Sequence, residues 1–437
     1  MLVVMVLASF PHAGDATTGR ASRLPRHFGI GLAAQPDASG IYGWLPDSRI
    51  PFDYAYQYLA GGVNTGQGWQ TWNSNAKFPL LYARGAHRHG YVPVFPYYML
   101  LQSNGPCGGC NEAEKDLAHL NSPNVMAAYY RDFETLMRRL AEYARTAIVH
   151  VEPDLSGYAQ QAVLNPSQWC YGYCTGKGND PNLLKASVRS SGVQGVAGYP
   201  DTYRGFNLAL LHLRDRLAPN VLLAFHVSDW TTGYDIGSQR DPVDARALGR
   251  KAGTFAARAG VLSSPRAVST YDLVFNDVAD RDAAYYKYVF GSNVFWDRTN
   301  RTVPNFHRWE RYIRGIVATT HRGVIVWQIP LGNQYFRTEN NTDGHYQDNR
   351  VAYFFHHVRE LIHTGVIGLL FGAGNGGSTT NSDAKHDGVT NPPSFCTKDG
   401  TSGEAVCNTH ESTVADDDGG YFRMQARRYY RSPVRLP

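Results

Sequence analysis

Acidic side chains stand where three short apolar runs of the chain end. The five candidates for chemistry are Glu152, Asp154, Asp229, Asp277 and Asp280. Two facing carboxyl groups can cleave a glycosidic bond, because one protonates the leaving oxygen while the other activates water or attacks the sugar carbon. A carboxylate at a strand end can also cap a loop or pair with an arginine, so a structural interpretation stays open beside the chemical one.

Glu152 and Asp277 are the leading pair. Alternate residues of a strand point to the same face, so counting by twos along the run puts His150 and Glu152 on one side. Glu152 then reaches the mouth of a barrel, and Asp154 lies one step into the following loop. The runs before Glu152 and Asp277 are the fourth and sixth, and strands of equal parity contribute to the same layer of a barrel. The other three acids are alternates or tuning partners of this pair.

Aromatic side chains crowd the same ends of the runs. Sugar rings present C–H groups, which pack on indole and phenol faces much as apolar groups do. A groove with several such rings would hold several sugar units, although large rings also fill loops as plain packing. The rings expected to contact a ligand are Trp69, Trp72, Tyr97, Tyr98, Trp230, Trp296 and Trp327, and Trp169 follows the fourth run.

Four polar residues are further candidates for holding a ligand. His226 can face the interior of a barrel, where a histidine is more often a hydrogen-bonded structural residue than a catalyst. Gln328 ends the seventh run in place of an acid, and His345 and Asp348 belong to a polar loop after it. Oxygen-rich loops after the seventh and eighth runs also admit a structural Ca²⁺, and no other metal or cofactor is expected.

Eight apolar runs alternate with segments of helical periodicity. The runs are near-continuous in apolar residues, which is typical of parallel strands buried on both faces. They span 28–33, 54–59, 91–98, 147–151, 221–227, 272–275, 324–327 and 366–371. Apolar residues at steps of three and four predict helices at 125–143, 203–217, 243–259, 305–320 and 349–364. This alternation predicts an α/β chain folded as a (β/α)₈ TIM barrel, in which active sites lie at the C-terminal ends of the strands.

A doubly wound open sheet is the competing architecture. It would usually carry a glycine-rich turn between its first strand and a helix. The glycine-rich stretch 372–377 follows the last run, but it contains no GxGxxG that opens onto a helix. The closed barrel is therefore the preferred interpretation.

Length and charge bound the remaining possibilities. The 437 residues fit one barrel with long loops, since such barrels run from about 250 to more than 400 residues. No repeat, heptad array or Pro/Ser linker divides the chain, so 27–437 is expected to form a single catalytic domain. The net charge of +5 is modest and the basic residues are dispersed, unlike the clusters of nucleic-acid-binding proteins. No nucleic acid, membrane or second subunit is expected as a partner.

The N-terminus and the cysteines favour secretion. Residues 1–16 have an apolar stretch followed by small residues, as in a signal peptide, although no basic residue precedes it. The six cysteines fall into three close pairs, Cys107/Cys110, Cys170/Cys174 and Cys396/Cys407. Local disulfides that stiffen long βα loops are the simplest explanation, and they require an oxidising compartment. A zinc site built on the CxxC pair is the alternative.

One short segment resembles a known family. Residues 152–155, Glu-Pro-Asp-Leu at the end of an apolar run, resemble the EPD-containing strand end of family 6 glycoside hydrolases, the inverting cellulases. The likeness covers 148–158, and the late Lys-Pro-Gly-Gly-Glu segment of that family is not found. The resemblance implies polysaccharide hydrolysis in a barrel, without fixing β-1,4-glucan as substrate. Retaining hydrolases of the largest barrel clan carry an Asn before the fourth-strand acid and a Glu on the seventh strand, and this chain departs from both features.

These features predict a secreted glycoside hydrolase that cleaves a polysaccharide or oligosaccharide with paired carboxylates at the C-terminal face of the barrel. A carbohydrate-binding barrel without catalysis is the alternative, because the seventh run carries no acid. Such a protein would keep the aromatic groove but tolerate loss of Glu152. A metal-dependent amidohydrolase would need His-x-His on the first strand, and 28–33 contains no histidine.

Overall fold

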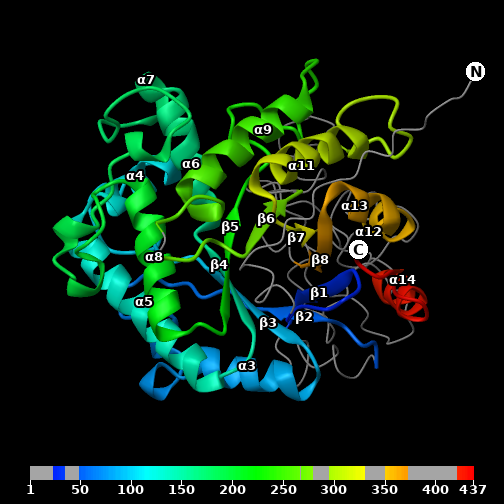
Figure 1. The fold of residues 1–437 in the computed structure, drawn as a ribbon, viewed down its shortest axis with the longest axis horizontal. Helices are drawn as coiled ribbons and strands as arrows, with labels where there is room; N and C mark the ends of the chain where they lie inside the picture. Colours follow the sequence, from blue (N-terminus) through cyan, green and yellow to red (C-terminus); the bar gives the residue numbers. More distant parts are fainter. Residues whose placement is uncertain (1–22, 35–48, 266, 279–294, 330–349, 373–420) are drawn as a thin grey trace, which may run out of the picture.

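Eight parallel strands close into a barrel in the computed structural model of the chain (Figure 1). The structure describes residues 23–34, 49–265, 267–278, 295–329, 350–372 and 421–437. Each strand pairs with its successor, and the last pairs with the first. The strands are β1 (Gly29–Ala33), β2 (Tyr54–Tyr56), β3 (Val92–Tyr97), β4 (Ala147–Val151), β5 (Val221–His226), β6 (Leu273–Asp277), β7 (Val324–Ile329) and β8 (Val366–Phe371).

The predicted (β/α)₈ barrel is therefore confirmed, because every predicted run overlaps its strand. Two strands extend further than their apolar runs suggest. β6 includes Asp277 and β7 includes Gln328, so these two polar residues belong to the strands themselves. Hydrogen bonding of the barrel continues past the point where apolar composition stops.

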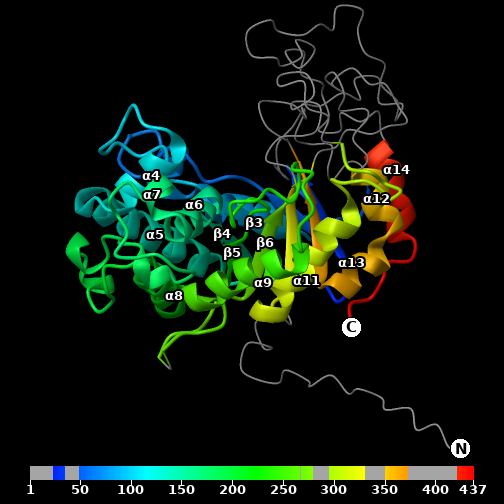
Figure 2. The ribbon, with the colours of Figure 1, turned by 90° about the horizontal axis from the view of Figure 1, so that it is seen from above.

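Helices form a layer outside the barrel (Figure 1). They are α3 (Phe78–Arg88), α4 (Glu112–Leu120), α5 (Pro123–Tyr143), α6 (Pro153–Leu164), α7 (Pro166–Trp169), α8 (Tyr203–Leu217), α9 (Ala245–Ala256), α11 (Phe306–Thr320), α12 (Arg350–His356), α13 (Val358–Thr364) and α14 (Tyr421–Tyr430). Figure 2 shows α4, α6 and α7 grouped on one side of the molecule and α12, α13 and α14 on the other. The five predicted helices are present, with 349–364 divided into α12 and α13.

Polar side chains cap the N-termini of several of these helices. Ser122 accepts a hydrogen bond from the first turn of α5, and Thr202, Asp244 and Asn305 do the same for α8, α9 and α11. Gly365 ends α13 with a φ of 98°, a left-handed conformation that glycine adopts without a steric penalty. Local sequence therefore sets these helix boundaries.

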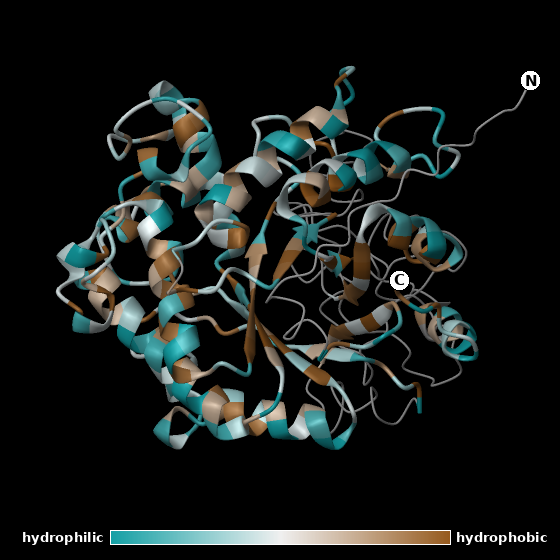
Figure 3. Cartoon of the chain, in the orientation of Figure 1, coloured by the Kyte–Doolittle hydropathy of each residue, from teal (hydrophilic) through white to brown (hydrophobic). Residues whose placement is uncertain are grey.

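The apolar strands bury both of their faces, as Figure 3 reflects in their largely hydrophobic colouring. One buried cluster fills the barrel interior and includes Ile148, Leu222, Phe275 and Ile325. A second, larger cluster lies between strands and helices and includes the alternate residues, such as Val149. This two-sided burial explains why the runs show no polar alternation.

Helices α9 and α11 pack unusually closely because small residues face each other. A Cβ atom added to Gly249 would lie 2.0 Å from the carbonyl oxygen of Tyr312, and one added to Gly315 would lie 2.3 Å from that of Arg246. The backbones can approach this far only where no side chain intervenes. The contact fixes α11 against the preceding helix of the layer.

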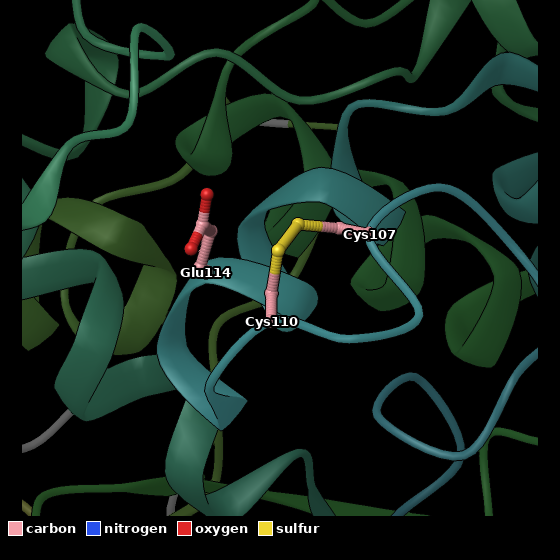
Figure 4. A group of neighbouring side chains, drawn as sticks. All are labelled: Cys107, Cys110 and Glu114. Atoms are coloured by element: carbon pink, nitrogen blue, oxygen red, sulfur yellow. A yellow bond between two sulfur atoms is a disulfide. The ribbon is translucent and has the colours of Figure 1, made fainter.

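Two of the three predicted disulfides are confirmed. Cys107 is bonded to Cys110 and Cys170 to Cys174, with Cα separations of 5.3 and 5.7 Å. Figure 4 shows the first bond at the start of α4, with Glu114 beside it. The two sulfurs are bonded to each other, which is not the thiolate pair that the zinc alternative requires. The pair at 396 and 407 lies outside the described residues.

Within the described ranges, no helix combines the length and the apolar character that crossing a membrane requires.

Candidate active site

A cavity of about 520 Å³ opens where the strands end. Carboxylates and aromatic rings make up most of its wall. The acids are Glu112, Asp154, Asp235 and Asp277; the rings are Tyr58, Tyr98, Tyr158, Trp169, Trp230 and Trp327; and Pro153, Gln161 and Gln328 complete the described lining. The cavity lies at the end of the barrel where (β/α)₈ enzymes place their active sites.

One face of α6 forms part of the cavity wall and packs against the indole ring of Trp230. Asp154, Tyr158 and Gln161 lie at steps of four and three along the helix, so they point to the same side. The Gln161 side chain donates to the carbonyl oxygen of Trp230 (2.9 Å), and the rings of Tyr158 and Trp230 lie 5.0 Å apart. A Cβ atom on Gly157 would lie 2.4 Å from that indole. Gly157 therefore leaves the space that Trp230 occupies.

Asp277 is the outer member of a chain of three side chains that leads into the barrel. Its Oδ1 lies 3.2 Å from His226 Nε2, and His226 Nδ1 lies 2.9 Å from His150 Nε2. Burial, and secondarily His226, hold the pKa of His150 well below its usual range, so that ring is neutral. The Trp327 indole packs edge-on against His150 at 4.8 Å. His226 is buried and is not among the lining residues, so it supports Asp277 from below.

Two further carboxyls lie near Asp277. Asp229 accepts a hydrogen bond from the Asn276 amide at 2.9 Å and is buried behind the wall. Burial, and then the charge of Asp277, raise the pKa of Asp229 well above its usual value. Burial also raises the pKa of Asp235, which lines the cavity and accepts a hydrogen bond from the Gly237 amide. Asp229 is therefore a buried neighbour of Asp277 that does not line the cavity.

Two rings that follow β2 and β3, and one ring of β7, form another part of the wall. Tyr58 lies 6.5 Å from Tyr98 and 5.6 Å from Trp327, measured between ring centroids. The Tyr98 hydroxyl donates to Glu112 at 2.8 Å, and the Gln328 side chain donates to the Tyr58 hydroxyl at 2.8 Å. These two bonds hold the hydroxyl groups of Tyr98 and Tyr58 in place.

Glu152 does not lie where the alternation of the strand predicts. Its φ of 36° and ψ of 73° are left-handed, so the chain turns directly from β4 into α6 and the counting by twos fails at this residue. The side chain is 2% exposed and accepts from the backbone amides of Met99 (3.1 Å) and Leu100 (3.2 Å). Burial raises the pKa of Glu152 to about 8. Glu152 is not among the lining residues of the cavity whereas Asp277 is, and the pairing of Glu152 with Asp277 stays a prediction.

The turn at Glu152 also changes the setting of Asp154. The sequence places Asp154 one step into a loop, whereas the structure places it in the first turn of α6, where it lines the cavity. A negative side chain is favourable there because the helix N-terminus carries a partial positive charge. Of the five acids singled out from the sequence, Asp154 and Asp277 are brought to the same cavity.

Two of the predicted ligand rings are packing residues. The Trp69 indole donates to Asp132 at 2.8 Å, and the Tyr97 hydroxyl donates to the same carboxylate at 2.6 Å. Both rings are fully buried between the barrel and α5. Their polar atoms are satisfied inside the protein, so neither ring lines the cavity.

Trp296 and Trp72 are also placed away from the cavity wall. Trp296 is buried against Trp309, and its indole nitrogen donates to the Gly237 carbonyl oxygen at 2.8 Å. Trp72 is 39% exposed and packs edge-on against Phe78 at 5.0 Å. Tyr98, Trp230, Trp327 and Gln328 do line the cavity, as does Trp169. Asp280, His345 and Asp348 lie outside the described residues.

Six lining residues were not predicted from the sequence: Tyr58, Glu112, Pro153, Tyr158, Gln161 and Asp235. Tyr58 could have been found, since counting by twos from Tyr54 reaches it. Tyr158 and Gln161 needed the knowledge that a helix begins at 153. Glu112 is the first residue of α4, and Asp235 lies in the loop after β5. No local sequence pattern indicates that either residue lines the cavity.

Comparison of the sequence with known protein families and curated proteins found no match. No protein-family model matches the sequence, and none of the curated proteins matches it. The resemblance of residues 152–155 to family 6 therefore stays a prediction.

Solved structures similar to this chain include three named as acting on carbohydrates or as glycoside hydrolases. GH5_18 from Streptomyces cattleya, in complex with GlcNAc, is 12% identical with a TM-score of 0.46, over 95% of this chain and 82% of that one. The catalytic domain of a GH26 endo-β-1,4-mannanase from Bacillus sp. JAMB-750 is 11% identical with a TM-score of 0.41, over 94% and 88%. An exo-β-1,4-mannosidase from an Opitutaceae bacterium is 10% identical with a TM-score of 0.42, over 92% of this chain and 59% of that one. This chain thus spans less than two thirds of that mannosidase. The likeness concerns the barrel fold alone.

Proposed function

We propose that the chain is a glycoside hydrolase that cleaves a polysaccharide or oligosaccharide in the cavity at the barrel mouth. The observation that carries the proposal is the composition of the cavity wall, in which four carboxylates stand among six aromatic rings. Rings offer flat apolar faces to sugar C–H groups, and paired carboxyls supply the acid and the base or nucleophile that glycosidic cleavage needs.

Asp277 and Asp154 are the proposed working pair. Asp277 sits at the end of β6 with a His226 ring nitrogen 3.2 Å from its Oδ1. A hydrogen bond from that nitrogen would orient the carboxyl at the cavity wall, which suits a base or nucleophile. Asp154 reaches the cavity from the first turn of α6 and would supply the second carboxyl of the pair. Glu112 and Asp235 are the other acids on the wall and would adjust the charge around this pair.

The test begins with a panel of plant, fungal and bacterial polysaccharides to find a substrate for the parent protein. Asp277→Asn and Asp154→Asn each keep the size of the side chain but remove its charge. General acid–base contributions are about 10² to 10⁴-fold, so each variant should lose activity in that range or beyond. Asp241→Asn, which changes an exposed acid of the loop after β5, is the matched control and should keep parental turnover. Retention of turnover within about tenfold by either cavity variant would remove that residue from the pair.

Glu152→Gln distinguishes the pair of Asp277 with Asp154 from the pair of Glu152 with Asp277 that the sequence predicts. Glu152 makes its contacts with backbone amides behind the wall, so the variant should stay within about tenfold of parental turnover. A loss as large as that of Asp277→Asn would restore Glu152 as a working residue.

A carbohydrate-binding barrel without catalysis is the second candidate. One observation favours it, since β7 presents Gln328 rather than an acid, and the amide of Gln328 is committed to Tyr58. Binding of several glycans by a parent protein that cleaves none of them would select this candidate.

We also infer that the protein is secreted. The bonds Cys107–Cys110 and Cys170–Cys174 support this inference, because disulfides persist in oxidising compartments. Peptide mapping under non-reducing conditions of protein collected from the culture medium should recover both bonds and Cys396–Cys407. Protein found only inside the producing cell, with free thiols, would contradict the inference.

A further inference from the structure

Three side chains of metal-binding type meet outside the barrel, between α11 and α13. His307 and Glu310 stand three residues apart on α11, and Glu360 lies on α13. One ligand atom from each lies within 4.8 Å of the other two. His307 Nε2 is 3.2 Å from a carboxylate oxygen of Glu360. None of the three lines the cavity at the barrel mouth, so the cluster has no part in the proposed hydrolysis.

Glu310 is the residue that points to a ligand. Its side chain is 2% exposed, and its Oε1 has no hydrogen-bond partner in the described part of the chain. Arg314 approaches the other oxygen at 3.7 Å, which is beyond hydrogen-bond distance. A buried carboxyl oxygen without a hydrogen-bond partner is costly, and a bound cation would remove that cost for Glu310.

We propose that His307, Glu310 and Glu360 bind a divalent transition-metal cation of the Zn²⁺ class, which ties α11 to α13. An imidazole nitrogen with two carboxylate oxygens is a ligand set that Zn²⁺ accepts, whereas Mg²⁺ and Ca²⁺ prefer oxygen alone. Zinc ligands lie about 2.0 to 2.2 Å from the ion, hence at most about 4.4 Å from one another. A small movement of the two partly exposed side chains, His307 and Glu360, completes that arrangement around the buried Glu310.

The position of the cluster gives the cation a structural role. α11 is held against α9 by the close glycine contacts, and α13 leads directly into β8. The ring of Phe306, at the start of α11, stacks on Tyr353 of α12 at 3.7 Å. A metal at His307, Glu310 and Glu360 would fasten α11 to α13 beside this stack. Part of the coordination shell would remain open to water because His307 is half-exposed.

The full-length protein, stripped with EDTA and kept non-reducing, is the sample for the test. Zn²⁺ is added, excess ion is removed by gel filtration, and bound zinc is measured together with the thermal unfolding midpoint. We expect about one Zn²⁺ per chain and a midpoint raised by a few degrees, since a ligand that binds only the folded state stabilises it. His307→Ala, Glu310→Gln and Glu360→Gln should each weaken binding by more than the roughly 10- to 100-fold that outer-shell partners contribute.

Two matched variants keep the test specific. His363→Ala removes an exposed histidine of α13, and Glu114→Gln removes the acid beside Cys107 and Cys110. Both should bind zinc like the parent. In EDTA, Glu310→Gln should be at least as stable as the parent, because it removes one of two neighbouring carboxyls; in Zn²⁺ the order should reverse.

The proposal fails if the parent protein binds no zinc and its midpoint does not move. It fails equally if His307→Ala, whose side chain is half-exposed and dispensable for packing, retains the full stoichiometry. In either case Glu310 and Glu360 form a carboxyl pair that shares a proton. Neither result bears on the proposed hydrolase, since activity is not the readout.

Discussion

At the scale of single residues, one backbone conformation decides which acids face the cavity. Glu152 adopts a left-handed φ of 36°, which a residue with a Cβ atom adopts only at an energetic cost. The turn sends its carboxyl to the amides of Met99 and Leu100, and it lets α6 begin at once with Asp154 on the cavity side. The φ and ψ angles of Glu152 thus decide that Asp154, and not Glu152, lines the cavity at the barrel mouth.

Gly157 offers a test of how Trp230 contributes to binding. Alanine at this position would lie 2.4 Å from the indole, so the ring would have to leave its seat. Alanine is otherwise better than glycine within a helix by about 1 kcal/mol, so the fold should survive. We expect Gly157→Ala and Trp230→Ala to weaken oligosaccharide binding by similar amounts, about 0.5 to 1.5 kcal/mol for a lost aromatic contact. Isothermal titration with a soluble glycan measures the change.

Trp72→Ala is the control for that comparison, because Trp72 is exposed and packs on Phe78 away from the cavity wall. Its affinity should equal that of the parent. Parental affinity in both Gly157→Ala and Trp230→Ala would mean that Trp230 serves packing alone.

His226 is a positioning residue in the proposed mechanism, and its role shows in kcat rather than in KM. Its Nε2 lies 3.2 Å from the Asp277 carboxylate. His226→Phe removes this contact and with it a group that orients the carboxylate, so kcat should fall. KM should change little because His226 does not line the cavity. An unchanged kcat would show that Asp277 does not depend on this histidine.

At the scale of elements, a buried ion network joins α8 to the start of β6. Arg214 is fully buried, and its guanidinium lies 2.6 Å from Asp272 and 2.8 Å from Asp215. It also donates to the hydroxyl of Ser269 at 2.7 Å. Such a network stabilises the fold only while every charge has its partner.

Removing Arg214 should therefore be severely destabilising. Arg214→Met leaves Asp272, which is 5% exposed, as an uncompensated buried charge. Breaking a buried pair in this way costs about 3 to 5 kcal/mol, to be measured as the free energy of unfolding in urea. The double variant Arg214→Met with Asp272→Asn should recover part of the loss, because the stranded charge is gone. Strict additivity of the two single changes would contradict the coupling.

At the scale of the whole molecule, stability should fall as pH rises through neutrality, and Glu152 is one cause. The pKa of Glu152 is about 8 in the folded protein against 4.5 in an unperturbed glutamate. Between these values the folded state holds a proton that the unfolded state releases, so this contribution to stability is complete below about pH 4.5 and is lost as pH approaches 8.

Glu152→Gln keeps a neutral side chain that can still accept from Met99 and Leu100. The unfolding midpoint of the variant should therefore exceed that of the parent by a margin that widens from pH 5 to pH 8. Glu142→Gln, which changes an exposed acid paired with Arg139, should show no such widening. A constant margin across this range would indicate that Glu152 is already ionised at pH 5 in the folded protein.

The sequence by itself determined the barrel and part of the site. Apolar composition on both faces of a strand is a local property that burial demands, so the eight runs and their order could be read without coordinates. Asp154, Asp277, Trp230 and Trp327 were likewise found because they lie at or just after the ends of buried strands, and the ends of parallel strands meet at one edge.

Only the tertiary structure decided which of these residues meet. The direction of Glu152 depends on one φ/ψ pair at a strand–helix junction, which strand periodicity does not specify. Trp69 and Tyr97 were removed from the site by Asp132 of α5, a partner far along the chain that satisfies their polar atoms. The same holds for His307, Glu310 and Glu360, which are brought together by the packing of α11 against α13. The periodicity of apolar residues predicts which face of a helix or strand is buried. It does not predict which other element covers that face, because that element can be distant in the sequence.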